Sequence, residues 1–466
     1  MTFYRTAGIV WVASALTAGC ASSSYDQLGH DVGQLVKSGA GVTPQWRLKT
    51  DDSLRKAVSA RLAAGVDADA AVEIALLASP DLQMSFERLG LARADYLEAA
   101  TLSDPVVSWS RQSLRGGPGS KVEWSVLQSI SDLFSLPVRR RAADQELNSA
   151  RLTAANEILA GIAAVRSAWL EALAAEKSAG LAAERGDLAR LEAELMERFV
   201  KAGNEPDTEL QAQRLAYAEQ QRETAAAETA RLQARVRLER LMGVSDLQLA
   251  WELRGEFAAL PETDGELADL ESAALRNRLD MQAARKRVDA RLAFLSSARQ
   301  KRLVPELVAG YGREREPDGT RLAGPQFELQ LPIFSAAQVA LARSDAEARL
   351  AMREAEAAAL DVRGDVRLAR AQLAVARAAL LLARDTSVPA AEIQADLRQR
   401  EFFYMIIGPF AAMQARGAVM EEKQQQLQAE RDYWLARIAL SRAAALPLQA
   451  IREWAEPAAA GEAGGP

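Results

Sequence analysis

Long helix-forming blocks dominate this chain, and two short segments with a different residue period interrupt them. Most of the sequence is Ala, Leu, Glu, Gln and Arg, the strongest helix formers, with little proline or glycine inside each block. Between residues 137 and 199 no proline breaks the pattern, which predicts a helix on the order of 90 Å long at about 1.5 Å per residue. Because a helix of this length needs neighbours along it, we expect long antiparallel coiled-coil helices.

The two interrupting segments, about 104–131 and about 304–332, have the features of β-hairpins. In the first, Val122, Trp124 and Val126 alternate with polar residues behind a glycine-rich turn. In the second, Phe327 and Leu329 alternate with Gln and Glu after a turn around residues 317–319. Such alternation fits a sheet that is wet on one face, in a soluble protein or in a transmembrane barrel alike. The predicted fold class is therefore mostly α with a small β part of four strands.

The hairpins lie about 200 residues apart, and the similarity extends to their flanks, which predicts an internal tandem repeat. Each half should contain a helix, two strands and a helical hairpin, the latter over about 137–242 and about 336–446. Pro389 predicts a joint or a bend in the second helical hairpin. The expected organisation is a leader over 1–19, a lipidated tether and equatorial segment over 20–70, a first repeat over 71–243, a connecting segment over 244–269, a second repeat over 270–446 and a C-terminal tail over 447–466.

The N-terminus has the features of a bacterial lipoprotein signal. Arg5 precedes an apolar run over 8–16 that is too short to span a bilayer, and Cys20 follows as the only cysteine in 466 residues. We expect the mature chain to start at Cys20, exported and lipidated; an ordinary secretory leader is the alternative, because Thr17 stands where such signals usually carry leucine. Ala21 resembles the residue that follows the cysteine in outer membrane lipoproteins. With no second cysteine, burial alone must hold the exported chain together.

Composition and charge exclude several classes of function. A net charge of -6 argues against nucleic acid, whose binding needs clustered cations. One histidine and one cysteine supply neither a metal cluster nor a catalytic triad, and no glycine-rich phosphate loop follows a strand. We therefore expect no enzyme, no cofactor, no metal site and no catalytic residue. No segment after the leader approaches 18 uncharged apolar residues, so no transmembrane helix is expected, and any membrane crossing would be made by strands.

The order of these elements resembles that of the TolC-type outer membrane factors of Gram-negative tripartite efflux systems. Residues 75–82 match the family's Ala-Leu…Pro-x-Leu pattern, and the likeness extends over about 70–446. Residues 404–410 and 431–437 resemble a branch associated with heavy-metal, especially copper, export. The resemblance implies an outer membrane exit duct with a large periplasmic part. Such a duct passively exports small toxic compounds or metal ions handed over by an inner-membrane pump and a periplasmic adaptor.

The same resemblance implies that two turns at the periplasmic tip contact the adaptor. Arg198, Phe199 and Gly203 correspond to the family's tip motif, with one extra residue between Phe199 and Gly203. Tyr404 and Gly408 belong to the second tip turn. These residues are the expected adaptor contacts.

Four strands cannot close a barrel in lipid, because an open sheet edge leaves unpaired amides that cost several kcal/mol each. Three copies would close a twelve-stranded barrel, so we expect a homotrimer, as in the family. The alternative is a lipid-anchored periplasmic coiled-coil scaffold with two small soluble hairpins and no pore activity. In the duct, the side chains expected to face outer membrane lipid are Trp109, Val122, Trp124, Val126, Phe327 and Leu329.

Overall fold

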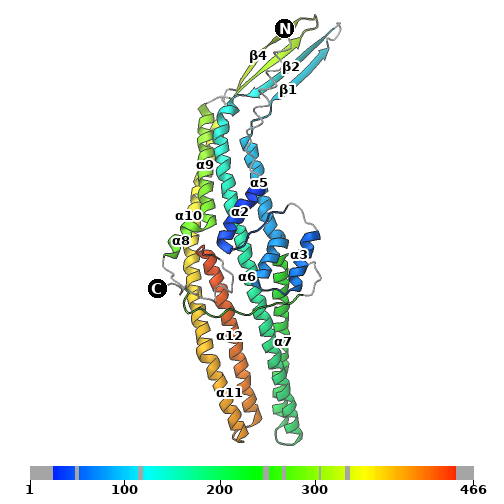
Figure 1. The fold of residues 1–466 in the computed structure, drawn as a ribbon, viewed down its shortest axis with the longest axis vertical. Coiled ribbons are helices and arrows are strands. Elements are labelled where there is room, and N and C mark those ends of the chain that lie inside the picture. Colours follow the sequence, from blue (N-terminus) through cyan, green and yellow to red (C-terminus); the bar gives the residue numbers. More distant parts are fainter. Residues whose placement is uncertain are drawn as a thin grey trace, which may run out of the picture.

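A computed structural model describes residues 25–47, 52–113, 119–244, 251–264, 269–303, 306–330 and 336–447. The molecule is elongated, with a four-stranded sheet at one end and two helical hairpins at the other (Figure 1). Between them lies a thicker equatorial region, where shorter helices pack around the long ones. Cys20 and the leader over 1–19 lie outside the described residues, so lipidation stays a prediction.

The two halves of the chain contain the same elements in the same order. The first comprises α4 (Ala68–Ala78), α5 (Pro80–Ala100), β1 (Val106–Ser113), β2 (Ser120–Ser129), α6 (Ser131–Lys201) and α7 (Asp207–Met242). The second comprises α8 (Leu270–Asn277), α9 (Leu279–Leu303), β3 (Glu306–Arg315), β4 (Arg321–Gln330), α10 (Ala336–Leu382), η2 (Ala383–Ser387), α11 (Val388–Phe403) and α12 (Pro409–Ala443). This order fits the internal repeat expected from the sequence, while the domain boundaries given above stay a prediction.

Helix α6 is longer than expected, because it starts at Ser131 and carries Pro137 inside it. Its 71 residues span roughly 105 Å at about 1.5 Å per residue. Pro137 lies in the second turn, where its missing N–H removes only one bond of the helical ladder near the helix start. The proline was therefore not the boundary that the sequence pattern suggested.

The second descending helix changes geometry just before Pro389. Residues Ala383–Ser387 form a π-helical turn, in which the N–H of Val388 donates to the carbonyl of Ala383, five residues earlier. Pro389 has no N–H to donate, and its ring crowds the carbonyl one turn before it. A wider turn at this point relieves that crowding and lets the helix continue into α11. The expected joint or bend is thus a π segment between two helices.

The four strands form one antiparallel sheet in the order β1-β2-β3-β4. Trp109 lies opposite Trp124 in the pairing of β1 with β2, and Trp124 lies opposite Arg313 in the pairing of β2 with β3. The central β2–β3 pairing therefore joins the two halves of the chain. The sequence predicted each hairpin but not this pairing.

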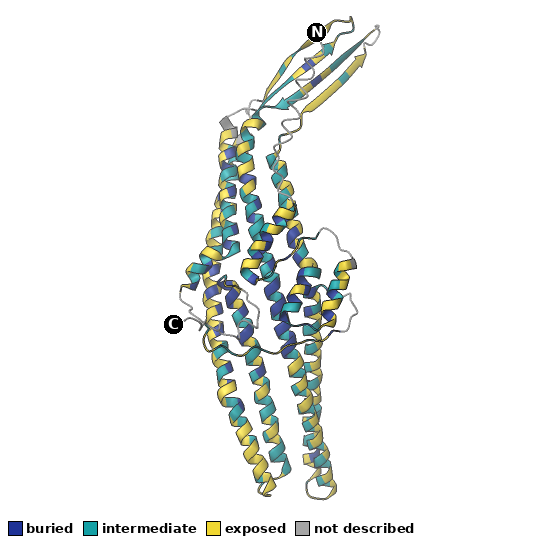
Figure 2. Cartoon of the chain, in the orientation of Figure 1, coloured by how far each residue is buried: buried dark blue, intermediate teal, exposed yellow. Residues whose placement is uncertain are grey.

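The equatorial region holds the hydrophobic core (Figure 2), where buried residues of both repeats meet. Helix α2 (Tyr25–Ala40) packs Leu28, Val32 and Val36 into this core, and each of the three is fully buried. A short helix, α3 (Asp52–Ala63), lies against α4 at the edge of this region. The sequence analysis described residues 20–70 as a lipidated tether and equatorial segment and predicted no helix there, although a four-residue apolar spacing is typical of a helix.

One 18-residue window of α6 is apolar enough, by length and composition alone, to cross a membrane. The window carries no more than two charged residues, and 61% of it is buried inside the molecule. Neighbouring residues such as Ile158, Ile162 and Trp169 belong to the equatorial core. Burial against other helices accounts for this apolar composition without a membrane.

Candidate functional site

The sheet has two chemically different faces. The first, here called the apolar face, carries Trp109, Trp124, Val126, Phe327 and Leu329, which the strand register places on one side. Trp109 is 68% exposed and Phe327 is 73% exposed. Large apolar side chains exposed in a row on one sheet face mark a surface that meets lipid or another protein. Val122 lies on the same face and is half-buried. All six residues that were expected to face lipid therefore share one side of the sheet.

The second, here called the polar face, carries small and acidic residues together with the apolar residues Val106, Leu127, Val308 and Leu322. Ser108 and Ser125 lie opposite each other, and their hydroxyl oxygens are 2.7 Å apart. Ser125 is buried although the sheet is a single layer, so this face is the more enclosed one. A Cβ added at Gly310 would clash with the backbone carbonyl of Val126 on the neighbouring strand, which explains the need for glycine there. Further carboxylates on this face come from Glu123, Glu314 and Glu328.

The sheet leaves two edges open in the single chain. Strand β1 pairs only with β2, and β4 pairs only with β3, within the described residues. In hydrocarbon each unpaired backbone group costs several kcal/mol, so such edges persist only where other strands cover them. An isolated chain therefore cannot carry this sheet across a membrane.

The two expected tip turns lie together at the end opposite the sheet (Figure 1). Phe199, at the end of α6, contacts Phe410 at the start of α12, with ring centroids 5.8 Å apart in an edge-to-face arrangement. Gly203 adopts a φ of +75°, the left-handed conformation that glycine tolerates best, and so allows the tight turn into α7. Arg198 is exposed beside this turn.

The second tip turn is apolar and exposed. Tyr404 is 79% exposed and Met405 is 92% exposed. Met405 has a φ of +60°, a backbone conformation that residues other than glycine rarely adopt. Ile406 is also exposed, and Gly408 precedes Pro409, the first residue of α12. The structure thus brings the five expected adaptor-contact residues to one end of the molecule. Their contact with an adaptor stays a prediction.

A row of exposed apolar residues on α10 marks a second unpartnered surface. Leu368, Val375 and Leu382 are 60%, 71% and 59% exposed, and they recur every seven residues. The core side of the same helix carries Val362 and Val366, which are buried. A second apolar stripe at heptad spacing is typical of a helix that packs against another coil. The single chain supplies no such coil for this side of α10 within the described residues.

A buried polar cluster ties the connecting segment to the second helical hairpin, and the sequence analysis missed it. The hydroxyl of Tyr433 donates to Oδ1 of Asp264 at 2.7 Å, and Arg377 donates to the same oxygen at 3.2 Å. Arg437 lies 3.6 Å from it. Burial, reinforced by the hydrogen bond to Asp264, raises the pKa of Tyr433 to about 12. Asp264 and Arg377 escaped notice entirely, because nothing in their local sequence distinguishes them.

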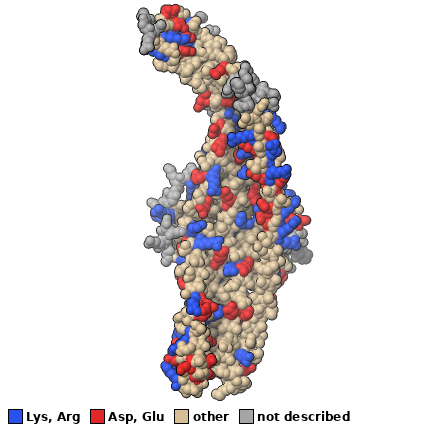
Figure 3. Space-filling model, turned by 180° about the vertical axis from the view of Figure 1, so that it is seen from behind, with Lys and Arg blue, Asp and Glu red and all other residues tan. Residues whose placement is uncertain are grey.

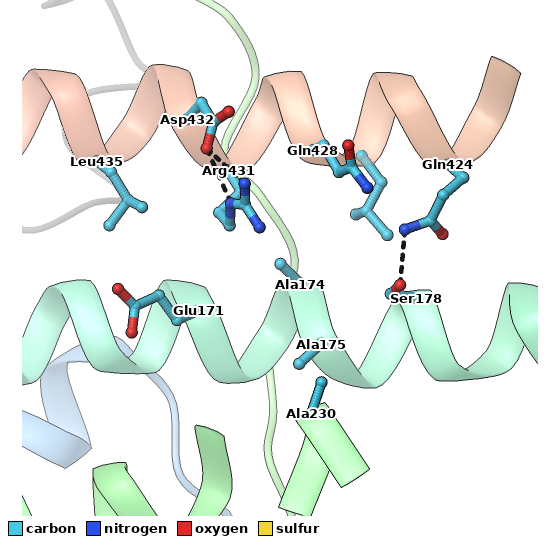
Figure 4. A pocket seen from close by; sticks show the side chains of 11 residues that line it. Glu171, Ala174, Ala175, Ser178, Ala230, Gln424, Gln428, Arg431, Asp432 and Leu435 are labelled. Carbon is cyan, nitrogen blue, oxygen red and sulfur yellow. Dashed lines mark hydrogen bonds and ion pairs between the residues drawn. The ribbon is translucent and has the colours of Figure 1, made fainter. Parts of the chain in front are cut away.

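A cavity of about 390 Å³ lies along the seam between α6 and α12 (Figure 4). Gln424 of α12 donates to the Ser178 hydroxyl of α6 at 2.6 Å. Nearer the tips, Arg185 of α6 pairs with Glu421 of α12 at 2.9 Å. Among the described residues no group of three or more His, Cys, Asp and Glu side chains is placed to hold a metal ion. The seam therefore joins the two helical hairpins through polar contacts.

The second repeat matches the family model of outer membrane efflux proteins over residues 270–446. The cobalt-zinc-cadmium resistance protein CzcC of Cupriavidus metallidurans is 26% identical over 329 residues, covering 70% of this chain and 77% of CzcC. The CmeC outer membrane channel of Campylobacter jejuni superposes with a TM-score of 0.70 at 14% identity, covering 89% of this chain and 91% of CmeC. A CusC structure superposes with a TM-score of 0.65 at 16% identity, covering 87% of this chain and 97% of CusC.

Long helices, a four-stranded antiparallel sheet and two turns at the far end define the fold of TolC-like outer membrane channels. The match over residues 270–446 places the second repeat in the outer membrane efflux protein family, whose members are channels of tripartite efflux systems and not enzymes, and the fold of the whole chain is that of these channels. Channels of this family form trimers, with the helical part in the periplasm. The resemblance, the fold class and the channel function inferred from the sequence are thereby confirmed.

Proposed function

We propose that three copies of this chain assemble into one exit duct, in which each copy contributes four strands to a closed barrel. The observation that carries the proposal is the pair of open edges at β1 and β4. Pairing β1 of one copy with β4 of the next satisfies both edges and closes the ring, as a barrel in lipid requires. The apolar face then meets the membrane, and the polar face lines the passage.

The exposed stripe on α10 supports the same assembly along the helical part. Leu368, Val375 and Leu382 gain a partner if a helix of the neighbouring copy packs against them. The helices then continue the passage into the periplasm. In this arrangement Cys20 adds a lipid anchor on the outside of the duct, and dissociation from the membrane becomes rare.

The two tip turns are the proposed docking site for a periplasmic adaptor, which links the duct to an inner-membrane pump. The support is their shared position and the strong exposure of Tyr404 and Met405. Apolar side chains exposed at a loop end are costly in water and gain stability when a partner covers them. Arg198, Phe199, Gly203 and Gly408 complete the surface.

The proposed cargo is a group of divalent metal cations. CzcC, the curated relative, is named for resistance to cobalt, zinc and cadmium. The polar face adds carboxylates at Glu123, Glu314 and Glu328, which favour cations in a passage. Deleting the gene should lower the tolerated concentration of these metals and leave tolerance to organic dyes unchanged. Loss of dye tolerance alone would contradict the proposed cargo without affecting the duct.

Cysteine cross-linking across the open edges tests the assembly directly. In one chain β1 and β4 are separated by two strands, which puts them on the order of 14 Å apart, too far for a disulfide. We would combine Ser110→Cys in β1 with a cysteine at residue 322, 324 or 326 in β4, on the same polar face. With Cys20 acylated, no other thiol competes.

Oxidation of the correct pair in cell envelopes should give a ladder that ends at the trimer. The Ser110→Cys single variant is the matched control, because one cysteine per chain allows a dimer at most. If every pair stays monomeric in envelopes while the protein is membrane-bound, the proposed closure is wrong.

A further inference from the structure

The charged residues of the sheet are sorted by face. Every described arginine of the four strands lies on the apolar face, the same face as the two tryptophans. The polar face instead carries Glu123, Glu314 and Glu328. This separation puts four positive charges on the side that is otherwise hydrophobic. The four arginines are Arg111, Arg313, Arg315 and Arg321.

These arginines are exposed and carry uncompensated charge. All four side chains are exposed, and none of them forms an ion pair with another described residue. Lys121, by contrast, lies on the polar face and pairs with Glu314 and, at 3.8 Å, with Glu316. The charge of Lys121 on the polar face is therefore neutralised within the chain. The four arginines on the apolar face have no such counter-charge among the described residues and are available to bind an anion.

The arginines gather at the end of the sheet away from the helices. Arg111, Arg315 and Arg321 share the last row before the turns, and Arg313 shares the next row with Trp109 and Trp124. Below them the apolar face continues through Val126 and Phe327 without a charge. Figure 3 shows charged side chains gathered at the tip of the sheet above a mostly uncharged stretch.

The spacing matches the thickness of an outer membrane. Leu307 and Arg315 are eight residues apart on β3, or roughly 27 Å along a strand at about 3.4 Å per residue. A tilt of about 40° reduces this to roughly 20 Å along the membrane normal, close to the apolar band of ~25 Å of outer membrane barrels. With Leu307 at the periplasmic boundary, the row of Arg111, Arg315 and Arg321 lies about 5 Å inside the external boundary of this band, a distance that a long arginine side chain can span to the headgroups. Arg313 lies level with the two tryptophans, one row below.

We propose that Arg111, Arg313, Arg315 and Arg321, with Trp109 and Trp124 in the same row as Arg313, form a binding band for a phosphate-bearing lipid headgroup of the external leaflet. The proposal rests on the sheet crossing the outer membrane. Guanidinium groups bind phosphate through paired hydrogen bonds, which strengthen where water is excluded. The acyl chains of the same lipid then lie on the apolar rows below, so one molecule satisfies both the charge and the apolar surface.

The test measures lipid retention by the full-length mature protein in a neutral detergent. The probes are lipid A carrying both phosphates and the same lipid with both phosphates removed. Native mass spectrometry should find the phosphorylated lipid bound to the wild type at least about tenfold more tightly than the dephosphorylated one. The quadruple arginine-to-glutamine variant should lose that difference, and the arginine-to-lysine variant should keep part of it because lysine retains charge without the planar fork.

The matched control removes the same charge elsewhere. Glutamine at four exposed helix arginines should leave lipid retention unchanged, at Arg190, Arg222, Arg343 and Arg353. Equal binding of both lipids by the wild type would overturn the proposal, as would an unchanged quadruple variant or displacement of the lipid by millimolar inorganic phosphate.

Channel conductance separates this proposal from the duct itself. In bilayers of neutral phospholipid without lipid A, wild type and quadruple variant should conduct equally. Conductance with no phosphate preference overturns only the lipid site. Absence of conductance with an intact phosphate preference contradicts the duct and leaves the lipid site standing.

Discussion

The equatorial core and the sheet use the same kinds of side chain in opposite surroundings. Trp434 and Phe86 in the core are 1% and 0% exposed, whereas Trp109 and Phe327 in the sheet are 68% and 73% exposed. The core residues find their neighbours within one chain. The sheet residues stay largely exposed in the single chain, so lipid and other copies must cover them. One part of the molecule is complete as a single chain, and the other is completed only by assembly.

Removing a core tryptophan should have the largest effect. Trp434→Ala removes a fully buried ring that stacks edge-to-face on Tyr433, 5.1 Å away. Cavity formation at such a site costs about 3–5 kcal/mol of unfolding free energy. Denaturant unfolding of the helical part, followed by circular dichroism, measures it.

Trp109→Ala is the matched control for the core variant, because it removes the same side chain from the sheet. Helical unfolding should be unchanged within ~0.5 kcal/mol. Equal destabilisation by both variants would contradict the division of the molecule into a complete part and an incomplete part.

Charged substitutions on the apolar face should have the second largest effect. Replacing both Trp124 and Phe327 by Asp places two carboxylates in hydrocarbon, at a cost of about 3 kcal/mol in total. Membrane-inserted trimers should fall sharply while the helical part stays folded, as read from protease protection and gel mobility. Gln326→Asp on the polar face is the control and should insert normally. Normal insertion of the doubly charged variant would mean that the apolar face does not meet lipid.

Alkaline pH should weaken the equatorial cluster. The ordinary pKa of tyrosine is about 10, and burial raises the pKa of Tyr433 to about 12, so the folded state holds its proton more tightly. The resulting stability is complete below pH ~10 and is lost as pH rises from about 10 to about 12, on the order of 2 kcal/mol in total. Asp264, Arg377 and Arg437 are the charged groups that face the hydroxyl.

Tyr433→Phe tests that pH dependence. The variant should lose less stability than the wild type between pH 9 and pH 12, as measured by urea unfolding at each pH. Parallel curves for the two proteins would show that another group controls alkaline unfolding.

Loss of the aromatic contact between the tips should have the smallest effect. Phe199→Ala removes the ring that packs on Phe410, and such a pair contributes about 1 kcal/mol. Hydrogen exchange should accelerate in both tip turns and stay unchanged in α2 and in the equatorial core. Faster exchange throughout the molecule would show that the tips and the equator open together.

The sequence predicted the parts of this fold that depend on local periods. The alternation at Val122, Trp124 and Val126 identified a strand, and the proline-free block identified α6. Pairing of β2 with β3 could not be read from the sequence, because its partners lie about 180 residues apart and no local signal selects their register. The start of α6 was also missed, since Pro137 is tolerated near a helix start.

In the candidate site, too, the features set by local sequence were predicted and those set by long-range contacts were not. The tip residues and the apolar face came from motifs and alternation, and the structure gathers them as expected. The arginine band was missed because its four members lie on three strands, and only the register shows that they share one end of one face. Asp264 contacts residues more than 100 positions away, so its role depends on tertiary packing alone.

Counting the subunits of single conducting channels tests the central claim most directly. The mature protein, labelled with one fluorophore per chain, is reconstituted in lipid bilayers, and photobleaching steps are counted at each spot that conducts ions. Three steps per conducting spot are the predicted result. Conduction by spots with a single step, or single-step spots whose hairpins remain open to water-soluble quenchers, would contradict the shared barrel.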